Sequence, residues 1–242
     1  MPGSLRSGSR LTSIRPRTER LACTARLVLL TATIALASCA PLALLPVVTP
    51  LLSIALASRG DGATSRLIAD FEKSQDWQGL AGLAQERLQL DPGDADGWFI
   101  LGYARIRLGD FARSAEAYAK VLERAPEDID AWNMLGESQR LAGHPDLAMA
   151  TLDRAVTIDP RSPATRYLLG EACRDAGRLE RAAAAYRDAV GLDPEFAPGW
   201  FGMGLALLRI GRKEELPAIV EHLHALDPAL GRELVRIQSG NK

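Results

Sequence analysis

Cysteine and histidine are scarce in this sequence, whose 242 residues include three of each. Cys23, Cys39 and Cys173 are far apart and odd in number, so they provide neither a disulfide framework nor the spacing of a zinc site. His222 and His224 lie two residues apart, which places them on different faces of a helix. We therefore predict no metal site and no cofactor.

Aromatic residues make up only 5% of the chain, and no run of β-branched residues alternates with polar ones. Alanine and leucine dominate instead, which favours helices throughout. The glycine patterns of phosphate-binding loops and the Gly-x-Ser-x-Gly motif of hydrolases are also missing. The sequence therefore predicts an all-α protein that is not an enzyme, with no catalytic residues and no small-molecule substrate.

Basic residues are concentrated at the N-terminus. Residues 1–39 carry six arginines and one glutamate, so of the 29 basic and 30 acidic residues 23 and 29 remain in residues 40–242, a net charge near −6. Phosphate binding requires a concentrated basic surface. We therefore do not expect nucleic acid to be a partner.

The N-terminal region has the order of an export signal. Its basic leader ends at Arg26, and the apolar run Leu27–Leu36 and small residues up to Cys39 follow. This order is typical of a secretory signal peptide. The run Leu27–Ser38 is shorter than the roughly 20 residues that span a bilayer.

The sequence Leu36-Ala37-Ser38-Cys39 resembles the bacterial lipoprotein box, whose cysteine is acylated and becomes the new N-terminus. This resemblance implies a lipid anchor on Cys39, and each buried methylene contributes about 0.8 kcal/mol to membrane binding. Ala40, not aspartate, follows Cys39, which by family analogy favours the periplasmic side of the outer membrane in a Gram-negative envelope.

Residues 40–60 leave alternatives open. They form a second apolar stretch whose prolines oppose a regular helix, and they include Ala55-Leu56-Ala57, a candidate signal-peptidase site. The stretch could be a linker, or Leu27–Ala57 could be an uncleaved, kinked membrane anchor. Cleavage after Ala57 would give a soluble secreted protein. The long basic lead leaves open a start codon downstream of Met1, and a mistaken start would leave a cytoplasmic protein.

Several series of residues recur every 34 positions after this region. They comprise prolines, two sets of glycines, tryptophans with one arginine, and large apolar residues. In order they are Pro92, Pro126, Pro160, Pro194 and Pro228; Gly102, Gly136, Gly170 and Gly204; Gly109, Gly143, Gly177 and Gly211; Trp98, Trp132, Arg166 and Trp200; and Leu101, Leu135, Leu169 and Met203.

A 34-residue period with the motif Trp-x-x-Leu-Gly resembles the tetratricopeptide repeat (TPR), in which each unit is a pair of antiparallel helices. The resemblance covers about 168 of the 242 residues. It implies a TPR superhelix, an α-solenoid of about five repeats with a C-terminal capping helix. The predicted repeats are 61–94, 95–128, 129–162, 163–196 and 197–228, with the capping helix and tail at 229–242.

Most residues of the repeat have structural roles. Gly102 lacks a side chain, so the second helix of its pair can approach closely, and Gly109 can end the first helix in a left-handed conformation. The aspartates before the repeat prolines suit the turns between pairs. Cys173 takes a core position and is predicted to be buried. Pro217 is tolerated only in a first helical turn, so the last second helix should begin late.

The first helices of such repeats line the concave side, where a protein or peptide partner binds. The register of the family predicts exposed aromatic residues interleaved with arginines, a composition enriched at interfaces. The aromatic residues could instead pack against the neighbouring helix pair. Solvated helix ends or local ion pairs with Glu137 and Glu171 are favoured over ligand binding for each arginine. The predicted groove residues are Phe99, Tyr103, Arg107, Asn133, Glu137, Arg140, Tyr167, Glu171, Arg174, Phe201, Leu205 and Arg209.

Repeats that clamp a terminal carboxylate use a lysine and asparagines in this groove. Phe99 and Tyr103 occupy the lysine and first asparagine positions here. The partner is therefore expected to be an apolar or mixed peptide segment, or a folded protein, rather than a terminal carboxylate.

The combination of Cys39 with about five repeats resembles the pilus-assembly lipoproteins, namely the repeat protein of the tight-adherence system and the type IV pilus pilotins. The resemblance implies a membrane-tethered, non-enzymatic scaffold that helps to assemble a pilus or secretion machine. The alternatives are a periplasmic chaperone or cell-wall-enzyme adaptor, and an inner-membrane assembly factor, as in cytochrome maturation, held by an uncleaved Leu27–Ala57 anchor.

Overall fold

The computed structural model describes residues 62–240, and every regular element in this range is a helix, as the sequence predicts. Cys39, the predicted signal peptide and the 40–60 segment lie outside the described residues. Within residues 62–240, the helices are either too short or too polar to span a bilayer.

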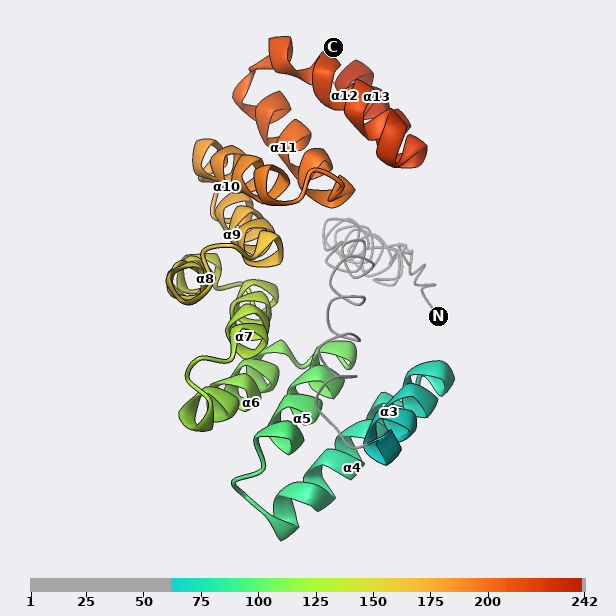
Figure 1. Cartoon of the computed structure of the whole chain (residues 1–242), viewed down its shortest axis with the longest axis vertical. Helices are drawn as coiled ribbons and strands as arrows, with labels where there is room; N and C mark the ends of the chain where they lie inside the picture. The colour runs from blue at the N-terminus through green and yellow to red at the C-terminus, as the bar shows by residue number, and fades with distance from the viewer. Residues whose placement is uncertain (1–61, 241–242) are drawn as a thin grey trace, which may run out of the picture. The chain divides into compact units, whose positions relative to one another are not determined.

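The helices follow one another as antiparallel pairs (Figure 1). A short 3₁₀ helix, η2, precedes the second helix of the last pair, and one further helix follows that pair. Their bounds are α3 Gly62–Ser74 and α4 Trp77–Leu90; α5 Ala95–Arg107 and α6 Phe111–Arg124; α7 Ile129–Leu141 and α8 Pro145–Ile158; α9 Pro163–Asp175 and α10 Leu179–Leu192; α11 Ala197–Ile210, η2 Lys213–Glu215 and α12 Leu216–Leu226; and α13 Pro228–Gly240.

Each helix packs against the helix before it and the helix after it, so one apolar core runs through the stack. In addition, the first helices of neighbouring pairs touch each other, α7 with α9 and α9 with α11. The stack of pairs from α3 to α13 curves in Figure 1. Helix pairs of this kind bury their apolar faces only by leaning on their neighbours.

Glycine ends the first helix of four successive pairs. Gly109 has a φ of 78°, and its three counterparts lie between 72° and 85°, in the left-handed region that costs other residues energy. Its amide donates to the carbonyl of Ile106 at 3.0 Å, and the next amide, of Asp110, donates to that of Arg105 at 2.9 Å. These bonds satisfy carbonyls that the helix end would leave unpaired.

An aspartate precedes four of the five repeat prolines and makes the turn at each of them. Asp91 Oδ1 accepts a hydrogen bond from the Gly93 amide at 2.8 Å, and Asp159 Oδ1 accepts one from the Arg161 amide at 2.9 Å. Asp193 and Asp227 make the same bond, at 3.0 and 2.9 Å, to the amides two residues on. These Asx turns reverse the chain where proline prevents the helix from continuing.

The repeated tryptophans tie each first helix to the turn before it. Trp98 Nε1 donates to the carbonyl of Pro92 at 3.0 Å, and Trp132 and Trp200 donate to their own repeat prolines at 2.8 and 2.9 Å. Arg166, which replaces the fourth tryptophan, donates to the Pro160 carbonyl at 3.2 Å. The substitution therefore retains the hydrogen bond while it loses the ring.

The C-terminal pair departs from the pattern, as the sequence predicts. Its second helix begins late: η2 intervenes, and Pro217 lies in the first turn of α12, where a missing amide is tolerated. Leu234 of α13 is fully buried, and a Cβ built on Gly204 of α11 would lie 2.6 Å from its side chain. The last helix therefore packs into the small-residue position of α11 and caps the core.

Candidate protein-interaction surface

The predicted groove residues all lie on the first helices α5, α7, α9 and α11. On each helix they are spaced three or four positions apart, which places them on one face. We call this side the first-helix face. The contacts of α9 with both α7 and α11 make this face continuous across three pairs.

The aromatic residues of this face are less accessible than predicted. Phe99, Tyr103 and Tyr167 are 0%, 1% and 3% exposed, so the expectation of exposed aromatics is wrong for these three. Phe99 packs edge-on against Tyr118 with ring centroids 5.1 Å apart, and Tyr167 packs against Phe196 at 5.2 Å. Neighbouring helices therefore cover these rings, and a role for them in binding stays a prediction.

Arg107 and Tyr103 join α5 to the first pair. The Arg107 guanidinium lies 4.0 Å from the centre of the Trp77 ring, a cation–π contact, and also donates to the Tyr103 hydroxyl at 3.3 Å. The Tyr103 hydroxyl donates to Glu72 at 2.6 Å. Burial, then the Glu72 carboxylate, raises the pKa of Tyr103 to about 12. Tyr103 is therefore a neutral donor at physiological pH.

Five charged side chains form an ionic cluster between α7 and α9. Arg140 donates to both oxygens of Glu137 at 2.8 Å and to Asp175 at 2.5 Å. Arg174 donates to Glu171 at 2.8 Å and to Asp175 at 3.0 Å. Asp175 therefore bridges the two arginines and links the helices. We call these five residues the central ionic cluster.

The arginines of the cluster are held as cations. Burial by itself would lower the pKa of Arg140, but the hydrogen bonds and charge of Glu137, with the charges of Glu171 and Asp175, raise it instead. The pKa of Arg174 also rises, because the Glu171 and Asp175 carboxylates outweigh its burial. These two arginines form local ion pairs, one of the alternatives that the sequence leaves open.

Glu171 is the most unusual member of the cluster, because it is only 2% exposed and its two oxygens differ. Oε1 accepts from Arg174 at 2.8 Å and from the buried Tyr186 hydroxyl at 2.5 Å. Oε2 is buried and has no hydrogen-bond partner. Burial raises the pKa of Glu171 above its ordinary 4.5, and the charges of Arg174 and Arg140 only partly offset this.

Asn133, one helical turn before Glu137 on α7, also has a buried oxygen without a hydrogen-bond donor. It is 5% exposed, and its Oδ1 has no hydrogen-bond partner. At the C-terminal end of the first-helix face the predicted residues are more accessible: Phe201 and Leu205 are half-buried and Arg209 is exposed. Both polar and apolar groups are therefore present on this face.

Two protein-family models match parts of the chain. The tetratricopeptide-repeat model matches residues 81–129 and 99–163, and a second TPR model matches residues 170–211. The chain is a tetratricopeptide-repeat protein. No curated protein matches the sequence.

Solved TPR structures resemble the chain in fold. YrrB, described as a TPR protein with an unusual peptide-binding site, is 18% identical with a TM-score of 0.56, and the match covers 69% of this chain and 87% of YrrB. A crystal structure of MamA is 18% identical over 73% of this chain and 92% of MamA, with a TM-score of 0.58. MamA from Desulfovibrio magneticus RS-1 is 24% identical over 71% and 98%, with a TM-score of 0.58.

Sequence reasoning missed Asp175, a member of the central ionic cluster, and Tyr186, which donates a hydrogen bond to the cluster. Asp175 is 34 residues after Leu141, so the repeat register could have marked it as the counterpart of an apolar position. Its bridging role depends on Arg140, 35 residues away, and no local pattern shows that pairing. Tyr186 belongs to a second helix, α10, and reaches Glu171 through the core of its pair.

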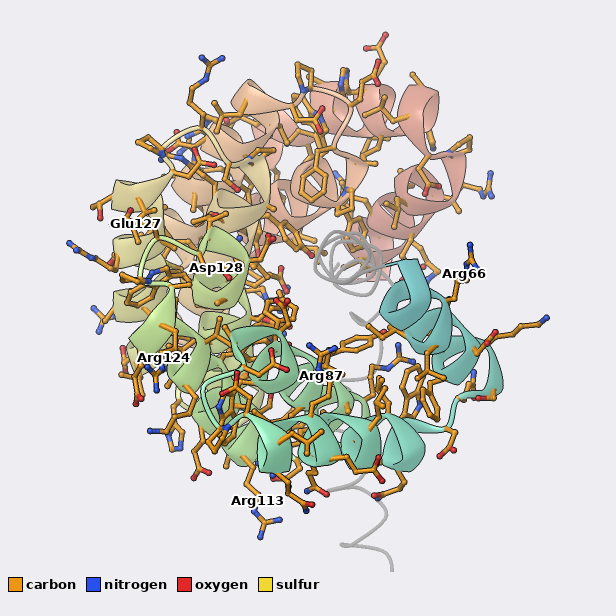
Figure 2. The ribbon with its side chains drawn as sticks, turned by 60° about the horizontal axis from the view of Figure 1, so that its bottom comes forward. Arg66, Arg87, Arg113, Arg124, Glu127 and Asp128 are labelled. Carbon is orange, nitrogen blue, oxygen red and sulfur yellow. The ribbon has the colours of Figure 1, made fainter. Side chains whose placement is uncertain are left out.

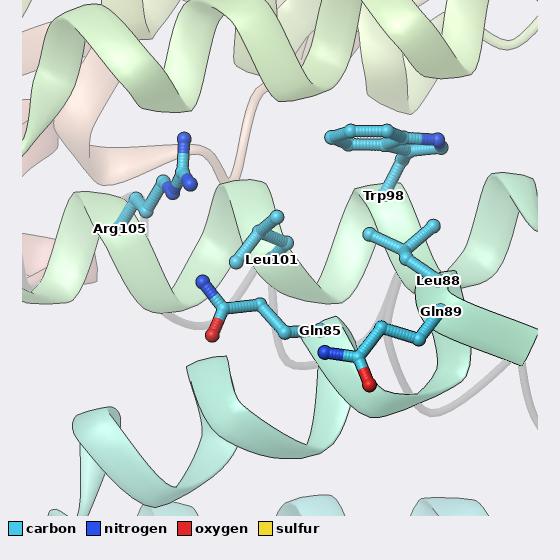
Figure 3. Close-up of a pocket in the computed structure, with 6 residues that line it drawn as sticks. All are labelled: Gln85, Leu88, Gln89, Trp98, Leu101 and Arg105. Carbon is cyan, nitrogen blue, oxygen red and sulfur yellow. The ribbon is translucent and has the colours of Figure 1, made fainter. Parts of the chain in front are cut away.

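A different hollow lies between α4 and α5 (Figure 3). Figure 3 shows Trp98, Leu101 and Arg105 of α5 on one wall and residues of α4 on the other. This pocket has a volume of about 360 Å³ and is lined also by Gln85, Leu88 and Gln89. It has no carboxylate, imidazole or thiol in its lining, and it includes a tryptophan of the structural series.

Charged side chains elsewhere on the TPR stack are mixed in sign (Figure 2). Arg66 and Arg113 point away from the ribbon in Figure 2, and Arg113 pairs with Asp110 at 3.2 Å. Arg87 pairs with Asp94 at 2.8 Å between α4 and α5. Within residues 62–240, no group of three histidine, cysteine or acidic side chains is arranged to hold a metal ion.

Proposed function

We propose that this TPR protein is a non-enzymatic scaffold that binds a segment of another protein on its first-helix face. The observation that carries the proposal is the composition of this face. A solenoid built only for stability would place apolar or solvated residues there, whereas α7 and α9 hold five charged residues and two buried acceptors without donors. Such groups are costly unless a ligand or water uses them.

The apolar part of the same face supports a protein partner. Phe201 and Leu205 of α11 are half-buried next to α9, which carries part of the central ionic cluster. Interfaces commonly combine a partly apolar centre with polar groups that set register. The similar fold of YrrB, a TPR protein with a peptide-binding site by its description, agrees with this reading at the level of fold.

Affinity purification of the tagged full-length chain from its native host cells tests this function. Phe201→Glu places a charge on the first-helix face, and Ala119→Glu places the same charge on the exposed side of the second helix α6. We expect the Phe201 variant to recover its partners at about one tenth of the wild-type amount or less, since burying an unpaired charge is costly. The Ala119 variant should match wild type.

Two results would contradict the proposal. Equal recovery of all partners by the Phe201 variant would show that binding occurs elsewhere. Failure to recover any partner, together with turnover of a substrate by the purified chain, would replace the scaffold with an enzyme.

The cellular setting of this function is a separate proposal. We propose that the chain is tethered through a lipid on Cys39 to the bacterial envelope, on the periplasmic side of the outer membrane, and helps to assemble a pilus or secretion machine. The supporting observation is the sequence Leu36-Ala37-Ser38-Cys39 at the end of a signal-like segment. A secretin or pilin gene beside this gene would support a role in assembling such a machine.

Labelled palmitate tests the anchor. Cells that express the wild-type chain should incorporate label into it, and Cys39→Ser should abolish the incorporation, while Cys23→Ser, which changes a cysteine inside the leader, should not. Incorporation that persists in the Cys39 variant would show that Cys39 does not carry the lipid, and would favour another form of attachment.

A further inference from the structure

The central ionic cluster contains a carboxylate oxygen that no donor uses. Both oxygens of Glu137 accept from Arg140, and the two oxygens of Asp175 accept from Arg140 and Arg174. Glu171 Oε1 accepts two hydrogen bonds, whereas Glu171 Oε2 accepts none. The cluster therefore contains one buried carboxylate acceptor that no hydrogen bond uses.

The arginines of the cluster are already committed to carboxylates. Arg140 uses Nε, Nη1 and Nη2 on Glu137 and Asp175. Arg174 uses its three nitrogens on Glu171 and Asp175. An anionic ligand would have to compete with these carboxylates, whose charge-assisted hydrogen bonds are among the stronger interactions of a protein. The cluster therefore disfavours an anion despite its two guanidinium groups.

The charge balance favours a cation. With Glu171 ionised, the cluster has three carboxylates and two guanidinium groups, a formal charge of −1. A neutral amide could donate to Oε2 but would leave this charge uncompensated in a buried place. An ammonium or guanidinium group supplies both the donor and the charge.

A second unused acceptor lies on the neighbouring helix. Asn133 precedes Glu137 by one turn of α7, α7 contacts α9, and Asn133 Oδ1 is buried without a partner. Lysine and arginine side chains carry several donors, so one cationic group can bond both a carboxylate and an amide oxygen.

We propose that the central ionic cluster binds a lysine or arginine side chain of the protein segment held on the first-helix face, with Glu171 Oε2 and Asn133 Oδ1 as acceptors. This assignment rests on the proposed function and specifies the chemistry of its ligand. The partner segment therefore has a lysine or arginine at one position, next to apolar residues that contact Phe201 and Leu205 of α11.

A randomised linear peptide library, displayed on phage and selected on the immobilised full-length chain, tests the inference. Peptides selected on wild type should be enriched in lysine or arginine at one position. Glu171→Gln should lose that enrichment, because its amide replaces the acceptor with a donor. Glu180→Gln, on the exposed side of α10, is the matched control and should retain it.

The affinity of one selected peptide then gives the size of the effect. Replacing its cationic residue by norleucine should weaken binding to wild type by about 10-fold or more, as expected for a charge-assisted hydrogen bond, and should weaken binding to Glu171→Gln much less. If circular dichroism shows that Glu171→Gln has lost helix, Asn133→Leu replaces it and should reduce the norleucine effect.

Proton release provides a readout that a purely structural role of Glu171 would not move. Burial raises the pKa of Glu171, and a bound cation should lower it again, so binding should release protons at a pH where Glu171 titrates in the free protein. Calorimetry of the cationic peptide in two buffers of different ionisation enthalpy should detect proton release with wild type and not with Glu171→Gln.

The outcomes separate this inference from the proposed function. Selected peptides without a cationic preference, or with one that Glu171→Gln retains, would overturn the cationic site and leave peptide binding intact. Failure to select any peptide above background would contradict peptide binding itself, and the inference would fall with it.

Discussion

The arginines of the first-helix face differ in how exposed they are. Arg107 is half-buried and Arg209 is exposed, whereas Arg140 lies among the buried residues of α7. The spacing explains the difference, because Arg140 follows Arg107 by 33 residues and not by 34. A shift of one position on a helix turns a side chain by about 100°, towards the neighbouring helix.

The close approach of α10 to α9 depends on Gly170. A Cβ at this position would lie 2.6 Å from a ring carbon of Tyr186, whose ring is buried and whose hydroxyl is bonded to Glu171. We expect Gly170→Ala to lower the free energy of unfolding by about 1–3 kcal/mol, the cost of overpacking a rigid core. Urea denaturation followed by circular dichroism measures this change.

Gly191→Ala is the matched control, because Gly191 lies inside α10 with open space around its Cβ position. Alanine is the better helix former there, so this change should raise stability by about 0.5–1 kcal/mol. Equal effects of the two substitutions would show that Tyr186 is not held close to Gly170.

Glu171 gives a pH-dependent prediction. Its pKa is raised by burial above the ordinary 4.5, so protonation favours the folded state. Relative to Glu171→Gln, this contribution to stability is fully present below the unfolded pKa and is lost as the pH rises through the folded pKa. The melting temperature of wild type should therefore fall relative to that of Glu171→Gln as the pH rises above 4.5, the ordinary pKa of a glutamate.

Melting curves of both proteins across this range check the sign. A wild-type advantage that grows with pH would mean that Arg174 and Arg140 outweigh burial and lower the pKa of Glu171. In that case Glu171 would be ionised in the free protein, and proton release on binding would not be expected.

At the scale of elements, the 34-residue grid predicts the fold because each series has a local physical cause. Glycine ends the first helix, aspartate makes the turn and proline stops the second helix, and none of these requires a distant partner. The grid predicts positions on the first-helix face but not burial. Phe99 and Tyr167 are covered by Tyr118 and Phe196, and only the packing of neighbouring helices determines that.

We predict that α13 stabilises the end of the stack through Leu234. Leu234 is 0% exposed and packs on Gly204, so Leu234→Ala should cost about 2–5 kcal/mol and expose the end of α11. Val235→Ala is the control, because Val235 on the same helix is 41% exposed. Hydrogen exchange should accelerate in α11 and α12 of the Leu234 variant first, since repeats contact only their neighbours.

Unchanged exchange in α11 and α12 of the Leu234 variant would contradict a capping role. So would an equal loss of stability in both variants, because α13 would then contribute through its exposed side rather than through Gly204.

At the scale of the whole molecule, we propose that a stack of helix pairs binds a protein segment on one face. The stack itself follows from the sequence, because helix pairs with one apolar face must lean on each other. The identity of the partner does not follow from the sequence, because the side chains that line the binding face of a repeat protein tolerate wide variation. What the chain does specify is one face with unused acceptors and accessible apolar residues on α7, α9 and α11.

Hydroxyl-radical footprinting of the full-length chain, with and without a partner recovered by affinity purification, tests this claim most directly. Binding should protect Phe201 and Leu205 on the first-helix face, while Leu147 and Leu192, which are 53% and 40% exposed on the second helices α8 and α10, should remain as reactive as in the free chain. Protection of Leu147 and Leu192 with Phe201 and Leu205 unchanged would contradict the account.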